Sequence, residues 1–439
     1  MLSNIKNKFF SSPSYSKMAG NISWIIADKI FRIFTGLIVT AWMARYLGPG
    51  NFGIYNYGLA FISFFSILST LGIDQILLRD IVRYEQDRDE ILGTTFLLRF
   101  AGSTLCVTFA TLTIYILKHG QPVLTGLVFL FSLSTLFQSF EVIEVFFKSK
   151  VLIRFPIIAK GIPFILINLF KVVLILSQAS LIWFGAAYAI ELFLCATGMV
   201  IAYKKYKFEI AKWTFGFSRA KYMLRQNLPL FFSSLAVVFY TRFDQILLGG
   251  MIDSHSVGIY AAATKITEIS YILPVAIITT VAPSLTKLHT QDIDRYRLRT
   301  QKFFNIMTLI GFAVIIPAII LSPYIIRLIY GAKYVTSSSV FSIHIWTFLL
   351  VSWGVVKELI LVTEGNQNVS LYSTVIAMAI NICLNLLLIP RLQENGSAVS
   401  AVVSQFVSVS LSLLIFRRSR NIVKQQLISL IRFYDIKPD

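Results

Sequence analysis

The stretch NISWIIADKIFRIFTGLIVTAWMAR, residues 21–45, decides the fold class of this chain. It is apolar over the roughly 20 helical residues that are needed to cross a hydrocarbon core of about 30 Å. Trp24 and Trp42 lie near its ends, where aromatic side chains anchor a helix at the two membrane surfaces. The stretch contains no small-residue cleavage site, so we interpret it as a membrane-spanning helix and not as a signal peptide.

Similar apolar runs recur along the whole chain, which is 56% hydrophobic and only 14% charged. A soluble domain carries about 25% charged residues. The pattern predicts an all-α polytopic membrane protein of about twelve transmembrane helices. We expect spans at residues 21–45, 52–73, 91–117, 123–147, 155–177, 181–203, 229–250, 257–285, 303–322, 340–362, 369–389 and 397–416.

The basic residues between these spans are distributed unevenly. If the N-terminus is cytoplasmic, 27 of the 40 Lys and Arg residues fall on the cytoplasmic side and five on the other. This asymmetry is the positive-inside pattern, and it predicts that both termini are cytoplasmic. It also accounts for most of the net charge of +19 without a nucleic-acid partner. Membrane lipids with anionic headgroups are natural partners of such loops.

The long basic loop at residues 204–228 separates two sets of six spans. We therefore expect two six-helix bundles, an N-terminal one in residues 1–215 and a C-terminal one in residues 216–439. FGIY at residues 52–55 opens the second span, and VGIY at residues 257–260 opens the eighth, its counterpart. The echo favours a duplicated bundle whose halves are related by an axis along the membrane normal.

Fifteen Lys, Arg, Asp and Glu residues lie inside the expected spans, apart from Arg45 at the very end of the first. Each ionised group at mid-membrane costs at least about 2.5–3.5 kcal/mol, so these side chains must face ionic partners or a water-filled cavity. The set comprises Lys29, Arg32, Arg99, Lys160, Lys171, Arg242, Lys265, Lys357, Asp28, Glu141, Glu144, Glu191, Asp244, Glu268 and Glu358.

Two interpretations of these charges stay open. In the first, Arg32, Arg242 and Lys265 line a central cavity that attracts an anionic cargo. The cavity would be extended by Lys29, Arg99, Lys160 and Lys171, and Asp28, Asp244 and Glu268 would couple transport to an ion gradient. In the second, the charges are structural ion pairs, because Asp28–Arg32 and Lys265–Glu268 have the spacing of neighbours on one helix face.

The sequence offers little support for enzymatic or metal chemistry. Its three cysteines and four histidines are scattered and form no ligand motif, so we expect no metal, no cofactor and no catalytic residues. The longest external loop, residues 323–339, is too short to form the large external loop expected of a polysaccharide polymerase.

Five strings resemble the polysaccharide transport family, and specifically the O-antigen unit flippases often called Wzx. They are ARYLGPGNFGIY (residues 44–55), LGIDQILLRDIVR (71–83), LPLFFSSLAVVFYTRFDQILLGGMIDSHSVGIY (228–260), YGAKY (330–334) and NICLNLLLIPRLQENGSAVSA (381–401). The resemblance implies a fold similar to multidrug and toxin extrusion (MATE) transporters and lipid II flippases.

The same resemblance implies a cargo and a setting. The cargo would be an oligosaccharide on undecaprenyl pyrophosphate, moved across the bacterial inner membrane by alternating access and driven by an ion gradient. A polymerase and a chain-length regulator of polysaccharide assembly would be partner proteins. The main alternative is a MATE-like exporter of small molecules, and a membrane enzyme of polysaccharide synthesis is a further one.

Overall fold

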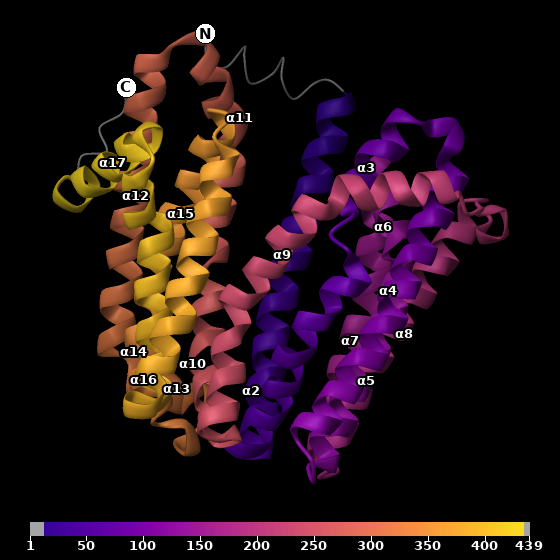
Figure 1. Ribbon diagram of the computed structural model, residues 1–439, viewed down its shortest axis with the longest axis horizontal. Coiled ribbons are helices and arrows are strands. Elements are labelled where there is room, and N and C mark those ends of the chain that lie inside the picture. The colour runs from indigo at the N-terminus through magenta and orange to yellow at the C-terminus, as the bar shows by residue number, and fades with distance from the viewer. Residues whose placement is uncertain (1–12, 434–439) are drawn as a thin grey trace. The chain divides into compact units, whose positions relative to one another are not determined.

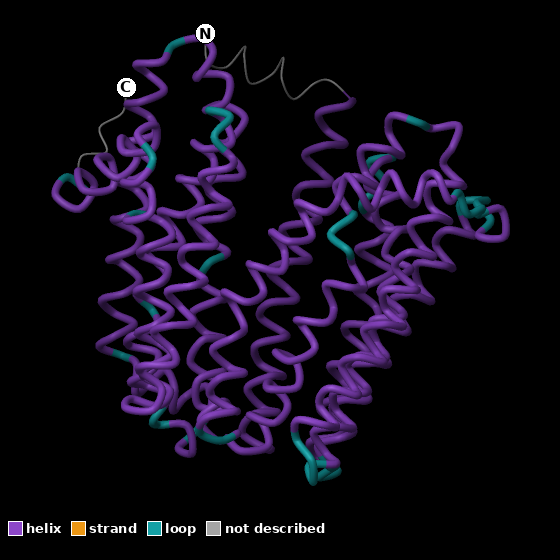
Figure 2. The backbone as a smooth tube through the Cα atoms, viewed as in Figure 1, coloured by secondary structure: helices purple, strands orange, loops and turns teal. Residues whose placement is uncertain are grey.

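The computed structural model describes the backbone of residues 13–433 and the side chains of residues 29, 31–228, 231, 232 and 234–433. Within that part the chain is helical and contains no strand (Figure 1; Figure 2). Its α-helices are α2 (Pro13–Thr70), α3 (Asp74–Arg83), α4 (Arg88–Leu117), α5 (Pro122–Gln138), α6 (Val142–Ser149), α7 (Arg154–Leu176), α8 (Leu181–Lys205), α9 (Phe217–Met251), α10 (Ser254–Ser270), α11 (Ile272–Gln291), α12 (Ile293–Ile320), α13 (Ser322–Tyr330), α14 (Ser337–His344), α15 (Trp346–Thr363), α16 (Gln367–Val409) and α17 (Arg420–Ile431).

Short 3₁₀ turns interrupt or join these helices. They are η1 (Glu85–Asp87), η2 (Ser139–Glu141), η3 (Ile210–Lys212), η4 (Ala332–Tyr334), η5 (Leu411–Ile415) and η6 (Arg417–Ser419).

The helices account for the expected number of spans. In the described part of the chain, nine helical stretches are long and apolar enough to cross a membrane. Two of them, α2 and α16, each consist of two helices joined at a non-helical residue. The 35-residue helix α9, some of whose side chains are not described, is long enough for another span. The prediction of a multi-pass protein with about twelve transmembrane helices is confirmed.

Each of the two long helices contains a joint between two helical arms. Gly48 has φ 71°, a left-handed conformation that glycine adopts without steric cost. Pro49 then begins the next helix, where its missing N–H is no loss. The joint of α16 is at Gln393. Its two arms lie side by side, because Asn381 in the first arm donates to the Ser404 hydroxyl in the second at 3.1 Å. The asparagine therefore links two helices, as small polar side chains do in membranes.

The chain forms two compact units, and a short middle piece of α2 belongs to the second one. The first comprises residues 1–46 and 61–234, and the second comprises residues 47–60 and 235–439. The first unit has an apolar core at the end that carries the basic loops, where Phe146, Phe147 and Tyr203 are fully buried. Trp213 donates its indole N–H to the Tyr203 hydroxyl at 3.2 Å, so the long basic loop is packed onto this unit.

In the second unit, the two segments that echo each other in the sequence are in direct contact. A Cβ atom on Gly53 would overlap the carbonyl oxygen of Ser254 and lie 2.8 Å from the Gly258 nitrogen. A Cβ atom on Gly258 would likewise overlap the Pro49 carbonyl oxygen. The two glycines therefore allow α2 and α10 to approach backbone to backbone, as small residues do at helix contacts in membranes.

Candidate functional site

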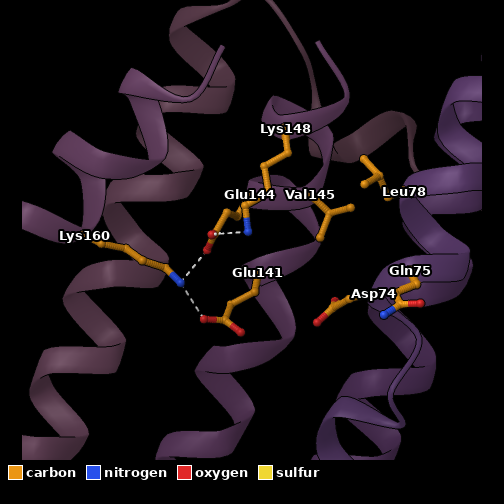
Figure 3. A pocket seen from close by; sticks show the side chains of 8 residues that line it. All are labelled: Asp74, Gln75, Leu78, Glu141, Glu144, Val145, Lys148 and Lys160. Atoms are coloured by element: carbon orange, nitrogen blue, oxygen red, sulfur yellow. Dashed lines mark hydrogen bonds and ion pairs between the residues drawn. The ribbon is translucent and has the colours of Figure 1, made fainter. Parts of the chain in front are cut away.

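The first unit contains a cluster of charged side chains around Lys160 of α7 (Figure 3). The Lys160 ammonium lies 2.6 Å from Glu141 and 2.5 Å from Glu144. Glu144 also pairs with Lys148 one turn further along α6, at 2.7 Å. The turn η2 ends at Glu141, and the two acids are three residues apart, a spacing that places side chains on the same side of a helix. One lysine is thus held by two carboxylates from the neighbouring span.

A third carboxylate faces this cluster across a cavity of about 310 Å³. It belongs to Asp74, which begins α3 and bonds the guanidinium of Arg99 from α4. The side chain of Arg99 is only 2% exposed, whereas that of Asp74 is 59% exposed. The buried cation therefore reaches its partner at the rim of the cavity. Within the described side chains, Asp74, Glu141 and Glu144 balance Arg99, Lys148 and Lys160, so the cluster is close to neutral.

The other lysine of α7 is arranged in the same way. Lys171 follows Lys160 by 11 residues, about three helical turns, so both lie on one face of the helix. Lys171 lies 3.4 Å from Glu191 of α8. The fifth span contains no acid of its own, and its two lysines find partners on the adjacent helices.

Arg32 on α2 lies against the same helix, with its guanidinium carbon 5.0 Å from the centre of the Phe164 ring. A cation over an aromatic face is stabilised by the ring quadrupole. Phe164 is one turn from Lys160 on α7. Arg32 therefore lies close to the face of α7 that carries the lysines.

In the second unit, Asp244 of α9 is the buried acid. It is 6% exposed and accepts hydrogen bonds from the Tyr260 hydroxyl of α10 and from the Gln245 backbone N–H, the latter at 2.7 Å. A buried carboxylate is tolerated when its oxygens are hydrogen-bonded. The hydrogen bond from the Tyr260 hydroxyl therefore helps to stabilise the Asp244 carboxylate at this buried position.

Arg242, two residues earlier on α9, points in a different direction and lies 3.5 Å from Glu268 of α10. Both side chains are about one-third exposed. The pair that helix spacing suggested, Lys265 with Glu268, is thus replaced by a contact between helices. Lys265 is exposed, and no carboxylate pairs with it among the described side chains.

The remaining sequence candidates are placed as follows. Lys29 is exposed on α2. The side chain of Asp28 lies outside the described residues, so its pairing with Arg32 stays a prediction. Lys357 is buried and donates to the Ser408 carbonyl at 3.4 Å, and Glu358 accepts from Ser370 at 2.6 Å. Both therefore have local polar partners near the end of a span.

Sequence reasoning missed two members of these clusters, Asp74 and Tyr260. Asp74 lies just outside the span expected at residues 52–73, and Tyr260 carries no charge that would single it out. A signal for the first existed in the string DQILL, which occurs at residues 74–78 and 244–248. Both of its aspartates occupy polar clusters inside a helical unit.

Residues 42–339, more than half of the chain, match the family described as "Polysaccharide biosynthesis protein". The chain belongs to this family. No curated protein matches the chain. As a member of the polysaccharide biosynthesis family, it has a fold that is also found in solved transporters of the MOP superfamily.

Three solved structures illustrate that fold. "Lipid II flippase MurJ, inward closed conformation" is 17% identical, covers 95% of this chain and 94% of its own, and has a TM-score of 0.73. An inward-facing multidrug resistance MATE family transporter is 14% identical over 92% and 95% of the two chains, with a TM-score of 0.71. A MOP superfamily transporter from Pyrococcus furiosus is 12% identical over 99% and 98%, with a TM-score of 0.59.

Proposed function

We propose that this protein is a flippase for an oligosaccharide linked to undecaprenyl pyrophosphate. The oligosaccharide would be the repeat unit of an O-antigen or related surface polysaccharide, and it would move from the cytoplasmic to the periplasmic leaflet of the bacterial inner membrane. Membership of a polysaccharide biosynthesis family in a chain with a transporter fold carries the proposal. The protein then moves its cargo by alternating access between the halves 1–215 and 216–439, without catalysing a reaction.

The cationic side chains divide into two classes under this proposal. Lys29 and Lys265 are exposed, and Arg242 is more than one-third exposed beside Glu268. Together with Arg32, these residues would be the first to contact the pyrophosphate. Charge-assisted bonds to phosphate oxygens are among the strongest polar contacts. The other candidates, Arg99, Lys160 and Lys171, already hold carboxylates, so they would contact cargo only by exchanging partners.

Energy coupling is assigned to the acids Asp244 and Glu268, with Asp28 as a third candidate. Asp244 is buried and hydrogen-bonded to Tyr260, and Glu268 holds Arg242 on the same two helices. A proton or cation that neutralises an acid here removes a charge from the membrane interior, where charge is costly. Release of that ion on the other side would drive the return step.

The test is translocation by the purified full-length protein in proteoliposomes. The probe is a fluorescent undecaprenyl-pyrophosphate oligosaccharide, and movement is measured as its accessibility to a membrane-impermeant quencher. Wild-type protein should accelerate translocation. Lys265→Ala and Arg242→Ala should reduce it, whereas Lys333→Ala, an exposed cation in η4, should not. Absence of accelerated translocation by the wild type would refute the proposal.

Arg32 needs a separate control, because its loss could act through Asp28. If Arg32 binds cargo, Arg32→Ala abolishes translocation and Asp28→Asn does not restore it. Rescue by the double substitution would assign Arg32 to helix packing.

The exporter alternative rests on the fold that the chain shares with a multidrug MATE transporter. It predicts export of small cationic drugs by the same vesicles, without movement of the lipid-linked probe.

A further inference from the structure

The side of the last helix, α17, that faces the protein carries two buried polar residues, Gln426 and Ser429, beside the buried Ile422 and Val423. Gln426 accepts a hydrogen bond from Ser410 at 2.8 Å and donates to the Val409 carbonyl at 3.1 Å. Ser429 shares a hydrogen bond of 2.8 Å with Thr308 of α12. Among the described residues, these polar groups are buried. The helix is therefore attached to α12 and to the end of α16 through hydrogen bonds.

The opposite side of α17 is apolar and exposed. Leu427 is 58% exposed and Ile431 is 74% exposed, and Leu430 is also exposed. A helix that exposes a row of apolar side chains on its outer side suits a lipid environment. At 1.5 Å per residue its 12 residues extend about 18 Å, too short to cross the bilayer.

The depth of α17 follows from its neighbours on α12 (Figure 1). Gln425 contacts Thr300, near the beginning of α12, at 3.0 Å. One turn later, Ser429 contacts Thr308, eight residues further along α12. The helix therefore starts at the end of the unit where α11 ends and α12 begins, and it extends toward the apolar part of α12. This is the position of an interfacial helix.

A cavity of about 630 Å³ opens beside this helix. Its lining brings together Arg297 from α12, Arg418 from η6 and Lys424 from α17, with Glu364 as the acid. Glu364 accepts from the Tyr296 hydroxyl at 3.5 Å. In the described part of the chain, no carboxylate pairs with Arg418 or Lys424, and the pair of Arg297 with Asp294 is a loose one at 4.0 Å. The cavity thus carries an excess of positive charge.

The cavity and the apolar side of α17 are continuous. Ile428 lines the cavity and is exposed. Lys424, Ile428 and Ile431 follow the spacing of four and then three residues, so they lie along one face of the helix. A cationic position at the outer end of this face is followed by apolar positions deeper in the membrane. A phospholipid has the same order, with an anionic phosphate above its acyl chains.

We propose that this cavity binds the headgroup of an anionic membrane phospholipid, with its acyl chains along the apolar face of α17. The phosphate contacts Arg418, Lys424 and Arg297, and the chains cover Ile428 and Ile431. The bound lipid links α17 to the turn between α15 and α16, which provides Glu364 and Asn366 to the same cavity. The cargo of the proposed flippase has no part in this site.

The test measures lipid retention by the full-length protein. Detergent-purified protein is titrated with phosphatidylglycerol or phosphatidylcholine, and bound lipid is counted by native mass spectrometry. Wild type should retain phosphatidylglycerol in preference to phosphatidylcholine. The double variant R418Q/K424Q should bind phosphatidylglycerol about 30-fold more weakly, since each basic residue near a lipid surface contributes a factor of about five. Equal retention of the two lipids by wild type would overturn the proposal.

Two further variants distinguish lipid binding at this site from general electrostatic attraction between anionic lipid and the basic protein. Arg432→Gln removes one exposed cation beyond the end of the same helix, and Arg432 is not part of the cavity lining. This variant should retain lipid like the wild type. Leu427→Gln with Ile431→Gln should weaken retention without any change in charge. A loss in Arg432→Gln as large as in R418Q/K424Q, or displacement of the lipid by millimolar inorganic phosphate, would overturn the proposal.

Discussion

The contact between Gly53 and Gly258 leads to a sharp prediction about packing within the second unit. A Cβ atom on Gly53 would lie 2.7 Å from the Ser254 carbonyl carbon and 2.8 Å from the Gly258 nitrogen. On Gly258, it would lie 2.8 Å from the Pro49 carbonyl carbon and 3.1 Å from the Gly53 nitrogen. All these atoms belong to the backbone, so no side-chain rotation relieves the overlap. Alanine at either position must push α2 and α10 apart.

The cost follows from the kind of strain involved. Extra methyl groups in a packed interior cost about 1–3 kcal/mol. A loss of 2 kcal/mol lowers Tm by about 4–8 °C for a unit of roughly 200 residues. The double variant should lose less than the sum of the single variants, because the helices separate only once and contacting sites are not additive.

The assay is thermal unfolding of the purified protein in detergent, followed by size-exclusion chromatography of the surviving monodisperse fraction. Gly50→Ala is the matched control, because it lies in the same turn and a Cβ atom there meets nothing within 4 Å. We expect wild-type behaviour from this control and reduced melting temperatures for Gly53→Ala and Gly258→Ala. Equal melting temperatures for all three variants would refute the close backbone contact.

Three other predictions concern charge, polar packing and topology. Asp74→Ala leaves the buried Arg99 guanidinium without its carboxylate and should destabilise the protein by about 3 kcal/mol. The double variant Asp74→Asn with Arg99→Met should recover much of this loss in the same thermal assay. No recovery would show that the loss of this ion pair is not the cause. Asn381→Leu removes the hydrogen bond to Ser404 between the arms of α16 and should cost about 0.6–1.7 kcal/mol. It is measured against Asn395→Leu, because the half-buried Asn395 accepts a hydrogen bond from the exposed Ser339 at 3.0 Å. An equal effect of the two substitutions would contradict this role. Reporter fusions at Asp253 and Asn395 should report the external side, and fusions at Lys212 and Asp439 the cytoplasm, because of the distribution of basic residues; the reverse pattern would overturn the orientation.

The helical architecture could be predicted from the sequence because the bilayer limits the choices. A chain in lipid must satisfy its backbone hydrogen bonds internally, so an apolar run of about 20 residues becomes a helix. The turn at Gly48-Pro49 has a similarly local cause, because glycine adopts a positive φ without steric cost. The helix α17 was not predicted from the sequence. Its 12 residues are too few to cross the bilayer, and its apolar side chains alternate with basic and polar ones, so the segment resembles a polar tail when it is considered without its neighbours.

The individual candidate charges were also identified from the sequence, since an ionisable residue in a span is conspicuous by its cost. Their partners were decided only by the tertiary structure. Lys160 pairs with Glu141 and Glu144 of another span, and Glu268 pairs with Arg242 and not with Lys265 on its own helix. Spacing along one helix defines which side chains share a face. Which faces meet depends on the packing of whole helices, and that packing is set by contacts distributed over residues far apart in the chain.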